Sequence, residues 1–201
     1  TMRALFGIDK LSSGELFLDG KPIRIHSPKD AIGHGICMVN EDRLRMGIFP
    51  KLSVKRNISV VYLSRITDPL GFVNFKKEDD ACQEMRNQLG IKMSSFKQLI
   101  SSLSGGNQQK SIIARWLLAK PRILILDEPT RGIDVGSKAE IHRQISMLAQ
   151  QGLAIIMISS ELQEVMGMSD RVMVMKDGMI VGEYLREEMD SSQIMKDAFG
   201  A

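Results

Sequence analysis

The chain has 201 residues, of which 43% are hydrophobic and 25% are charged, with 27 lysines and arginines against 24 aspartates and glutamates. These proportions are ordinary for a globular domain, and they exclude an intrinsically disordered or fibrous protein. A net charge of +3 is too small to indicate nucleic acid as the partner. No stretch approaches the roughly 18 consecutive apolar residues of a membrane span, so a membrane function would need another chain to cross the bilayer.

The two cysteines and the charged runs do not indicate a binding or catalytic site. Cys37 and Cys82 show no spacing typical of a disulfide framework or a metal site, so two reduced thiols are expected. The run of lysines and acidic residues at positions 76–80 is short and of mixed sign, which predicts the solvated surface of a helix.

The first 50 residues predict short elements. Residues 2–7 look like the last turns of a helix closed by Gly7, with no helix start in front of them. Residues 14–21 predict a strand that runs into an Asp-Gly turn, which is a strong hairpin signal. Residues 36–39 predict a short buried strand that leads into the polar residues 40–43.

The next part of the chain, from about residue 52 to 118, has a helical pattern. Helices are predicted over residues 54–63 and 76–89, the second closed by Gly90. A third begins at residues 105–107, and Pro121 stops it. Its apolar residues gather on one face: Ile112, Ile113, Trp116 and Leu117.

After Pro121 the pattern alternates between strands and helices. Apolar runs at residues 123–126 and 154–158 predict strands covered on both faces, and the helix between them, residues 137–151, carries one apolar stripe. Residues 159–161 are predicted to cap the following helix. A hairpin is predicted around an Asp-Gly turn, with strands at residues 172–175 and 179–181. Together these elements predict an α/β core with an inserted helical lobe.

Two acidic residues, Asp127 and Glu128, follow the predicted strand 123–126 directly. A buried parallel strand places such residues at the carboxyl edge of its sheet, where α/β folds bind ligands. One carboxylate there can hold Mg²⁺, usually through water, and the next can polarise an attacking water. The alternative is an exposed acidic turn without a ligand.

The segment 103–109, Leu-Ser-Gly-Gly-Asn-Gln-Gln, is more specific. Two glycines at a helix start allow backbone N–H groups to approach an anion, and the hydroxyl of Ser104 adds a donor. The pattern therefore predicts a phosphate contact. The alternative is a flexible helix cap with no ligand.

With these two motifs the chain resembles the ATP-binding cassette (ABC) ATPases. Residues 103–110 resemble their signature motif, residues 123–128 their Walker B strand, and residues 129–134 their D-loop. Residues 130–136 and 158–162 are similar to the second cassette of double-cassette ATPases that drive bacterial import of ribose, galactose and related monosaccharides. The resemblance covers nearly the whole chain. It implies a P-loop NTPase-like α/β core with a parallel sheet, an inserted helical subdomain and short antiparallel hairpins.

The chain departs from the family pattern in several places. It contains no Walker A sequence G-x-x-x-x-G-K-[ST], and residues 2–7 resemble the end of the helix that follows that loop. We therefore expect the chain to start just after Walker A, with the P-loop strand missing. Glu41 stands at the position of the Q-loop glutamine, and Ser160 at that of the switch histidine. These two changes indicate that the ATP site built on this cassette is degenerate.

The resemblance also implies a domain division, ligands and residue roles. The chain is expected to form a partial ABC ATPase domain, with a helical signature subdomain at about 50–118 and the α/β core and hairpins in residues 1–49 and 119–201. ATP and Mg²⁺ are the implied ligands. Asp127 would hold Mg²⁺ through water, Glu128 would be catalytic and Asp134 would belong to the D-loop. The residues implied to meet the ATP of a partner cassette are Ser104, Gly105, Gly106, Asn107 and Gln108.

The implied function is transport-coupled ATP hydrolysis by a complete importer at the cytoplasmic face of the membrane, in which this half mainly donates its signature motif. Its partners would be the N-terminal cassette of the same protein, a permease subunit touched by residues 41 to about 63 and, indirectly, a sugar-binding protein, with no nucleic acid. This chain alone is expected to be inactive.

The expected state of the isolated chain follows from its sheet. A missing strand would leave the sheet face beside residues 123–126 and 155–158 uncovered, so we expect the chain to dimerise. Two other functions remain: a soluble ABC-type ATPase acting on the ribosome or DNA, and a non-catalytic interaction module. The near-neutral charge and the short helical lobe disfavour the first of these.

Overall fold

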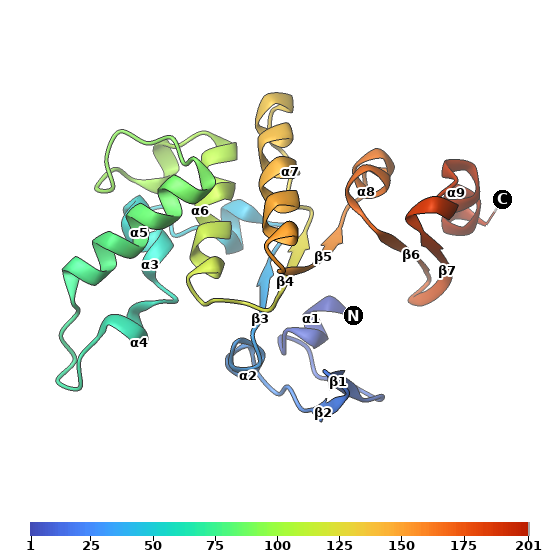
Figure 1. The fold of residues 1–201 in the computed structure, drawn as a ribbon, viewed down its shortest axis with the longest axis horizontal. Helices are drawn as coiled ribbons and strands as arrows, with labels where there is room; N and C mark the ends of the chain where they lie inside the picture. The colour runs from blue at the N-terminus through green and yellow to red at the C-terminus, as the bar shows by residue number, and fades with distance from the viewer. Residues whose placement is uncertain (201) are drawn as a thin grey trace. The chain divides into compact units, whose positions relative to one another are not determined.

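The computed structural model describes residues 1–200. They divide into two compact units, Thr1–Ile156 and the remainder from Met157 (Figure 1). Among residues 1–200, no helix is both long enough and apolar enough to cross a bilayer.

The first unit begins with the short elements that the sequence predicts. Helix α1 (Met2–Leu5) leads to Gly7, and strands β1 (Leu16–Leu18) and β2 (Lys21–Ile23) form an antiparallel hairpin. Both turn residues have positive φ, 51° at Asp19 and 72° at Gly20, as a tight hairpin turn requires. Helix α2 (Pro28–Gly33) follows, and the hydroxyl of Ser27 caps it by accepting from the N–H of Asp30.

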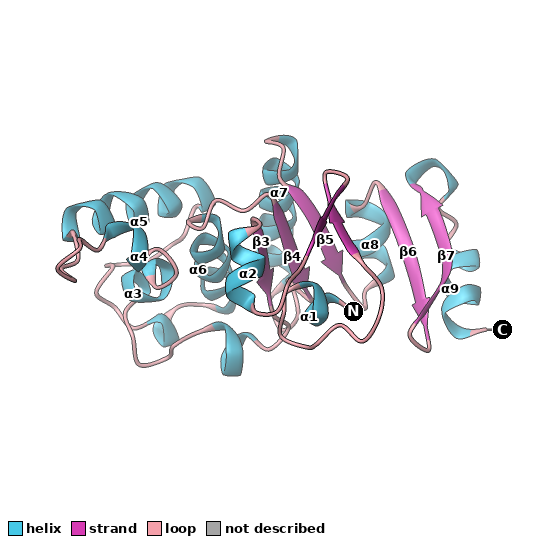
Figure 2. Cartoon of the chain, turned by 90° about the horizontal axis from the view of Figure 1, so that it is seen from below, coloured by secondary structure: helices cyan, strands magenta, loops and turns pink. Residues whose placement is uncertain are grey.

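A parallel sheet forms the centre of the fold, with the order β3, β4, β5 (Figure 2). Strand β3 (Ile36–Val39) pairs with β4 (Ile123–Asp127) in a register that places Val39 opposite Leu126. Strand β5 is Ala154–Ile158. Leu124, Ile125 and Leu126 have no solvent exposure. The expectation of an uncovered sheet face beside residues 123–126 is therefore wrong, because the three middle residues of this strand are fully buried.

Strand β5 differs from the predicted strand with two covered faces. Ala154 is exposed, and the four residues that follow it are only half-buried. As an outer strand of the described sheet, β5 has a neighbouring strand on one side only. The same half-burial agrees with the expectation that apolar surface beside residues 155–158 is partly uncovered.

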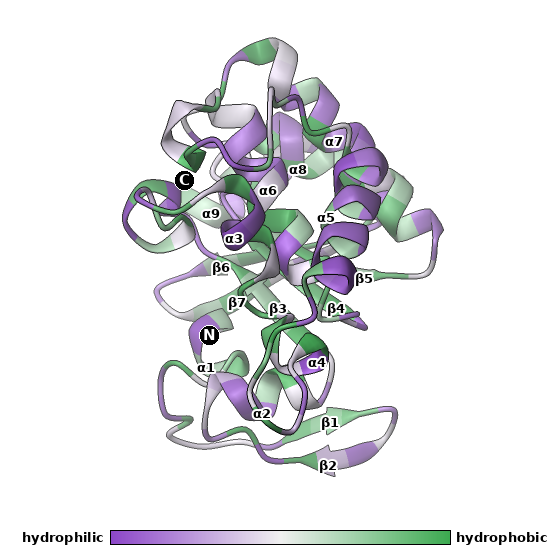
Figure 3. Cartoon of the chain, turned by 90° about the vertical axis from the view of Figure 1, so that its left-hand side faces the viewer, coloured by the Kyte–Doolittle hydropathy of each residue, from purple (hydrophilic) through white to green (hydrophobic). Residues whose placement is uncertain are grey.

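The helical lobe contains α3 (Val54–Ser59), α4 (Leu63–Ile66), α5 (Phe75–Leu89) and α6 (Gly105–Leu117), and α3, α5 and α6 contact one another. A π-helix (Arg43–Gly47) precedes the lobe and a 3₁₀ turn (Ile100–Ser102) precedes α6. The single helix predicted over residues 54–63 is two short helices. Helix α5 is mostly hydrophilic, as its colours in Figure 3 show, and Gly90 closes it in a left-handed conformation.

Helix α6 is buried on more sides than the predicted apolar face, because it contacts α3 and α5 of the lobe and also α7 and β3 of the core. Even its polar residues Gln108, Gln109 and Lys110 are at least nine-tenths buried. The buried charge of Lys110 is compensated by an ion pair with Glu140 of α7. Nζ of Lys110 lies 2.5 Å from Oε2 of Glu140. The pattern of apolar residues alone therefore underestimated how deeply this helix is packed.

One charged residue of the run 76–80 contradicts the predicted solvated surface. Glu78 of α5 has no exposure. It accepts from the hydroxyl of Ser59 at 2.6 Å and from Nη1 of Arg56 at 3.0 Å, and Nζ of Lys55 lies 3.5 Å away. The prediction failed because these partners come from α3, which packs against this side of α5.

Helix α7 (Val135–Gln150) completes the first unit, with the predicted stripe of Ile141, Ile145 and Leu148 buried. The two cysteines are free thiols without exposure, as expected. Burial raises the pKa of both Cys37 and Cys82 to about 12, so neither is a reactive thiolate at neutral pH.

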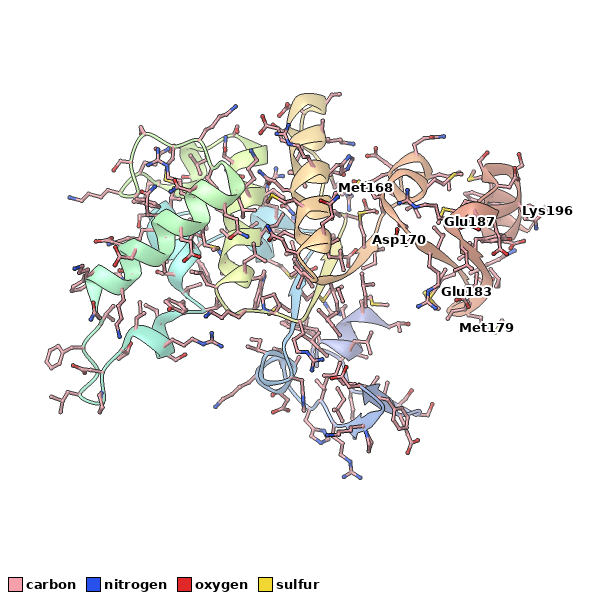
Figure 4. All side chains as sticks on the ribbon, viewed as in Figure 1. Met168, Asp170, Met179, Glu183, Glu187 and Lys196 are labelled. Carbon is pink, nitrogen blue, oxygen red and sulfur yellow. The ribbon has the colours of Figure 1, made fainter. Side chains whose placement is uncertain are left out.

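The second unit contains α8 (Leu162–Met168), the antiparallel hairpin β6 (Arg171–Lys176) and β7 (Met179–Leu185), a 3₁₀ turn (Arg186–Glu188) and α9 (Ser191–Phe199). Its core is Val172, Val174 and Ile194. Two acidic residues labelled in Figure 4 form surface ion pairs: Glu183 with Arg171 at 2.9 Å and Asp170 with Arg186 at 3.5 Å.

This unit keeps the predicted turn and capping residues and adds one helix. The hairpin has the predicted Asp-Gly turn, and the N-cap of α8 is Glu161, within the predicted residues 159–161, although its side chain makes no cap bond. The hydroxyl of Ser159 instead accepts from the N–H of Glu161, 3.0 Å away. Helix α9 was not predicted, although its signals are present: Asp190 caps it at Gln193, and Gly200 ends it with a φ of 72°.

Candidate functional site

Carboxylates gather where β3 and β4 end. Because Val39 pairs with Leu126, the residues that follow both strands leave the sheet at one edge, which places Glu41 near Asp127 and Glu128. Partial burial raises the pKa of Asp127, and the negative charges of Glu41 and Glu128 raise it further. A cation at this edge would relieve both effects. The chain thus has the right charge for Mg²⁺ here.

These carboxylates do not form a complete metal site by themselves. Among residues 1–200, no group of three or more His, Cys, Asp or Glu side chains is arranged to hold a metal ion. Mg²⁺ usually binds through one or two carboxylates and completes its octahedron with waters and phosphates. The edge therefore fits a magnesium ion that arrives with a nucleotide, and does not fit a structural metal.

Glu128 has a backbone conformation that is rare for its type. Its φ is 47°, in the left-handed region, and its carbonyl accepts from the N–H of Arg131 at 3.1 Å. A non-glycine residue in that region costs on the order of 1–3 kcal/mol. The turn is nevertheless held, because Pro129 and Thr130 inside it are buried. Such a strained residue next to Asp127 is typical of a functional site.

The start of α6 presents unsatisfied donors. The first N–H groups of a helix have no intrahelical acceptor. Ser104, the exposed N-cap, makes no side-chain cap bond, and its Oγ accepts instead from Nδ2 of Asn107 at 2.9 Å. Oδ1 of Asn107 in turn accepts from the N–H of Lys92 at 2.8 Å. Backbone donors at this terminus are thus left for a ligand, with the positive end of the helix dipole behind them.

Gln108 lies differently from the other residues of the predicted phosphate contact. It is 6% exposed, and its Nε2 donates to the carbonyls of Leu103 at 3.1 Å and Ile100 at 3.3 Å. In this structure Gln108 therefore anchors the start of α6 from inside the lobe.

The residues of two predicted motifs meet at the starts of α6 and α7. A Cβ placed on Gly106 would lie 2.6 Å from both Cβ and Oγ of Ser137, so only glycine fits there without a shift. Oδ1 of Asp134 caps α7 by accepting from the N–H of Ser137 at 2.9 Å. This bond is the main reason why the pKa of Asp134 is lowered. The predicted signature therefore packs against the start of α7, which Asp134 of the predicted D-loop caps.

Arg43 is a residue of this site that no motif predicts. A Cβ placed on Gly105 would lie 3.1 Å from Nη2 of Arg43, so this guanidinium packs against the helix start. Its Nε and Nη1 are buried and have no hydrogen-bond partner among residues 1–200. Burial lowers the pKa of Arg43. The only signal in the sequence was the polar run that follows the strand at 36–39.

Ser160, predicted at the switch position, belongs to the second unit. It is exposed in the turn that follows β5. Its relation to Asp127 therefore stays a prediction.

A model of the ABC transporter family matches residues 1–131. The chain belongs to the ABC transporter family. It is 52% identical over 196 residues to a putative ribose/galactose/methyl galactoside import ATP-binding protein of Pseudomonas fluorescens, covering 98% of this chain and 38% of that protein. A relative of the same description from Rhizobium etli is 50% identical over 198 residues, with the same coverage of 98% and 38%. The chain thus spans well under half the length of these relatives.

Solved structures confirm the predicted fold class of an ABC ATPase cassette. An ATP-binding cassette of an ABC transporter in its ADP conformation has a TM-score of 0.81 at 20% identity, over 100% of this chain and 82% of that one. The cbiO1 protein of Clostridium perfringens, described as part of the ABC transporter complex cbiONQ, has a TM-score of 0.75 at 26% identity, over 93% and 72%. The parallel sheet and antiparallel hairpins are those of this P-loop NTPase-like fold.

Proposed function

We propose that this chain is a cassette of an ATP-hydrolysing importer that takes up a monosaccharide such as ribose or galactose, and that its main contribution is its signature motif. The observation that carries the proposal is the start of α6, where Ser104 leaves the terminal N–H groups uncapped and the Gly106–Ser137 contact holds them in place. The names of the relatives support the substrate class.

At the signature, this chain would supply donors to a nucleotide held by a partner cassette, the N-terminal half of the same protein. The hydroxyl of Ser104 and the N–H groups of Gly105, Gly106 and Asn107 would meet oxygens of the γ-phosphate. A fixed donor of this kind stabilises charge that develops in the transition state, and loss of one costs about 10²- to 10³-fold in rate. Asp134 would keep the start of α7 rigid beneath them through its cap bond to Ser137.

At the carboxylate edge, this chain would bind the Mg²⁺ of its own nucleotide weakly. Mg²⁺ would neutralise phosphate charge there. Asp127 would hold it through water, and Glu128 would orient and polarise an attacking water. Glu41 places a negative charge where a neutral amide is usual, which raises the electrostatic cost of a phosphate nearby. Because the 201 residues contain no Walker A sequence, we expect them to hydrolyse no ATP by themselves.

A permease subunit is the proposed partner of residues 41 to about 63, with the chain bound at the cytoplasmic face of the membrane and a sugar-binding protein acting indirectly. Apolar side chains in this part are unusually exposed: Leu44 by 62%, Met46 by 53% and Phe49 by 47%. An apolar surface of this kind is typical of a protein interface. Residues of about 50–118, which follow this surface in the chain, would form the signature subdomain.

The test is uptake by the complete transporter. The full-length ATPase, its membrane subunits and its binding protein are reconstituted in vesicles, and ATP-dependent uptake of radiolabelled ribose and galactose is measured, with vesicles lacking the membrane subunits as the control. Uptake of either sugar supports the proposal. Hydrolysis that ribosomes or DNA stimulate, without uptake of any sugar, would support a soluble ABC-type ATPase instead. Absence of both activities would leave an interaction module.

A further inference from the structure

The exposed apolar side chains lie on residues 43–52, which we call the apolar segment. It begins with the π-helix Arg43–Gly47, which Asp42 caps by accepting from the N–H of Arg45 at 2.9 Å. Leu52 near its end is 42% exposed. Its outward side is thus open to a partner, while its inward side is held by two arginines.

The first of these, Arg115 of α6, holds the middle of the segment. It is 5% exposed and uses all three nitrogens of its guanidinium: Nη1 donates to the carbonyl of Gly47 at 2.7 Å, Nε to that of Asn57 at 2.6 Å and Nη2 to Oδ1 of Asn57 at 3.1 Å. Its Cζ lies 5.3 Å from the ring centroid of Phe49. Burial lowers the pKa of Arg115 to about 10, so it stays charged at neutral pH.

Asn57 of α3 also binds the backbone of the apolar segment. Its Oδ1 accepts from the N–H of Phe49 at 2.8 Å, and its Nδ2 donates to the carbonyls of Phe49 at 3.0 Å and Leu52 at 3.3 Å. Asn57 itself has no exposure. The segment is therefore fixed to α6 by oriented hydrogen bonds, and a lysine in place of Arg115 could not reproduce their planar geometry.

Arg43 holds the beginning of the segment against the other end of α6, beside Gly105. Ten residues of helix separate the two attachments, which is about 15 Å. The position of Arg43 is costly, since two of its buried N–H groups lack acceptors and a cation at a helix N-terminus opposes the dipole. An anion at the start of α6 would lower that cost. The energy of this arrangement thus depends on whether phosphate is bound.

We propose that Arg43 and Arg115 are positioning residues that tie the apolar segment to both ends of α6, and so couple phosphate binding at the signature to the contact with the permease. This rests on the proposed function. A phosphate at the start of α6 would offer acceptors to the buried N–H groups of Arg43, so nucleotide binding would shift the segment between two arrangements. Couplings of this kind are typically 5- to 150-fold, and we expect about tenfold here.

The test follows the exposure of the segment in the full-length ATPase. Met46→Cys introduces a thiol on the segment, other reactive cysteines are removed, and Cys37 and Cys82 can stay because they are buried. The rate of alkylation by N-ethylmaleimide is measured with and without Mg-ATP, and ATP binding is measured in parallel. We expect Mg-ATP to change the rate about tenfold. The same measurement is made on the variants Arg43→Met, Arg43→Lys and Arg115→Met. The melting temperature of each variant is measured to check that it is folded.

The matched control is Arg86→Met. Arg86 lies on α5 in the same lobe, where it stacks on Phe96 and donates to the carbonyl of Met93. We expect the control to keep the nucleotide effect, Arg43→Met to lose it while still binding ATP, and Arg43→Lys to retain part of it.

Two results would overturn the coupling. They are a nucleotide effect that persists in both Met variants, or an ATP-binding parent protein that shows no effect at all. If Arg115→Met fails to fold, the half-buried Arg43 still decides the question through Arg43→Met and Arg43→Lys. Loss of ATP binding in the parent protein would instead overturn the proposed function.

Discussion

The contact between Gly106 and Ser137 gives a sharp test of how the signature is held. In Gly106→Ala the new methyl carbon would lie 2.6 Å from Cβ and Oγ of Ser137, about 1 Å closer than ordinary contact. The starts of α6 and α7 must therefore separate. Overpacking of this kind costs about 1–3 kcal/mol, and at about 2 kcal/mol the melting temperature of a chain of this size falls by about 4–8 °C.

The assay is urea unfolding of the 201-residue chain, followed by circular dichroism. Gly33→Ala is the matched control, because a Cβ on Gly33 would meet nothing within 4 Å. It should leave the stability unchanged or raise it slightly. The double variant Gly106→Ala with Ser137→Gly removes the clash from the other side, so it should be more stable than Gly106→Ala alone. Wild-type stability of Gly106→Ala, or additive losses in the double variant, would refute the reasoning.

Three further predictions follow from charges and donors. Glu78→Gln should lower the free energy of unfolding by about 1–3 kcal/mol, measured with urea, because it weakens buried bonds to Arg56 and Ser59. Asp127→Asn should raise stability at pH 7 without Mg²⁺: the pKa of Asp127 is raised in the folded state, so its ionisation opposes folding. That gain should vanish below about pH 4, where the unfolded chain is protonated too, as urea titrations at both pH values would show. In the full-length transporter, Ser104→Arg should abolish transport-coupled phosphate release, whereas Glu128→Gln should leave a substantial fraction; equal damage from both would mean that the carboxylate edge is a competent site.

Local signals predicted much of the fold, because the residues that decide a turn or a strand are neighbours in the chain. The Asp-Gly turns at residues 19–20 and 177–178 both have the positive φ values that a tight hairpin needs. In the apolar run 123–126, Leu124, Ile125 and Leu126 are buried as predicted. Parallel strands also place Glu41 and Asp127 at one edge, which follows from topology alone.

What could not be predicted depends on partners far along the chain. The sequence predicts Glu78 to be a surface charge. Its partners Arg56 and Ser59 reach it only because α3 packs against α5. The same holds for Arg43, whose neighbour Gly105 is 62 residues away in sequence. A single sequence does not show whether a charged residue is buried, because the neighbouring residues can be the same whether its side chain contacts water or a buried partner.

The left-handed backbone of Glu128 lowers the stability of the fold at the position of a carboxylate with a proposed role in hydrolysis. A glycine there would relax the turn, because it has no Cβ to oppose a φ of 47°. The chain would then become more stable by about 1 kcal/mol while losing its carboxylate. A search for stabilising substitutions in this cassette would therefore select against the carboxylate that we propose to be catalytic, and a melting temperature alone would rank such a variant as improved.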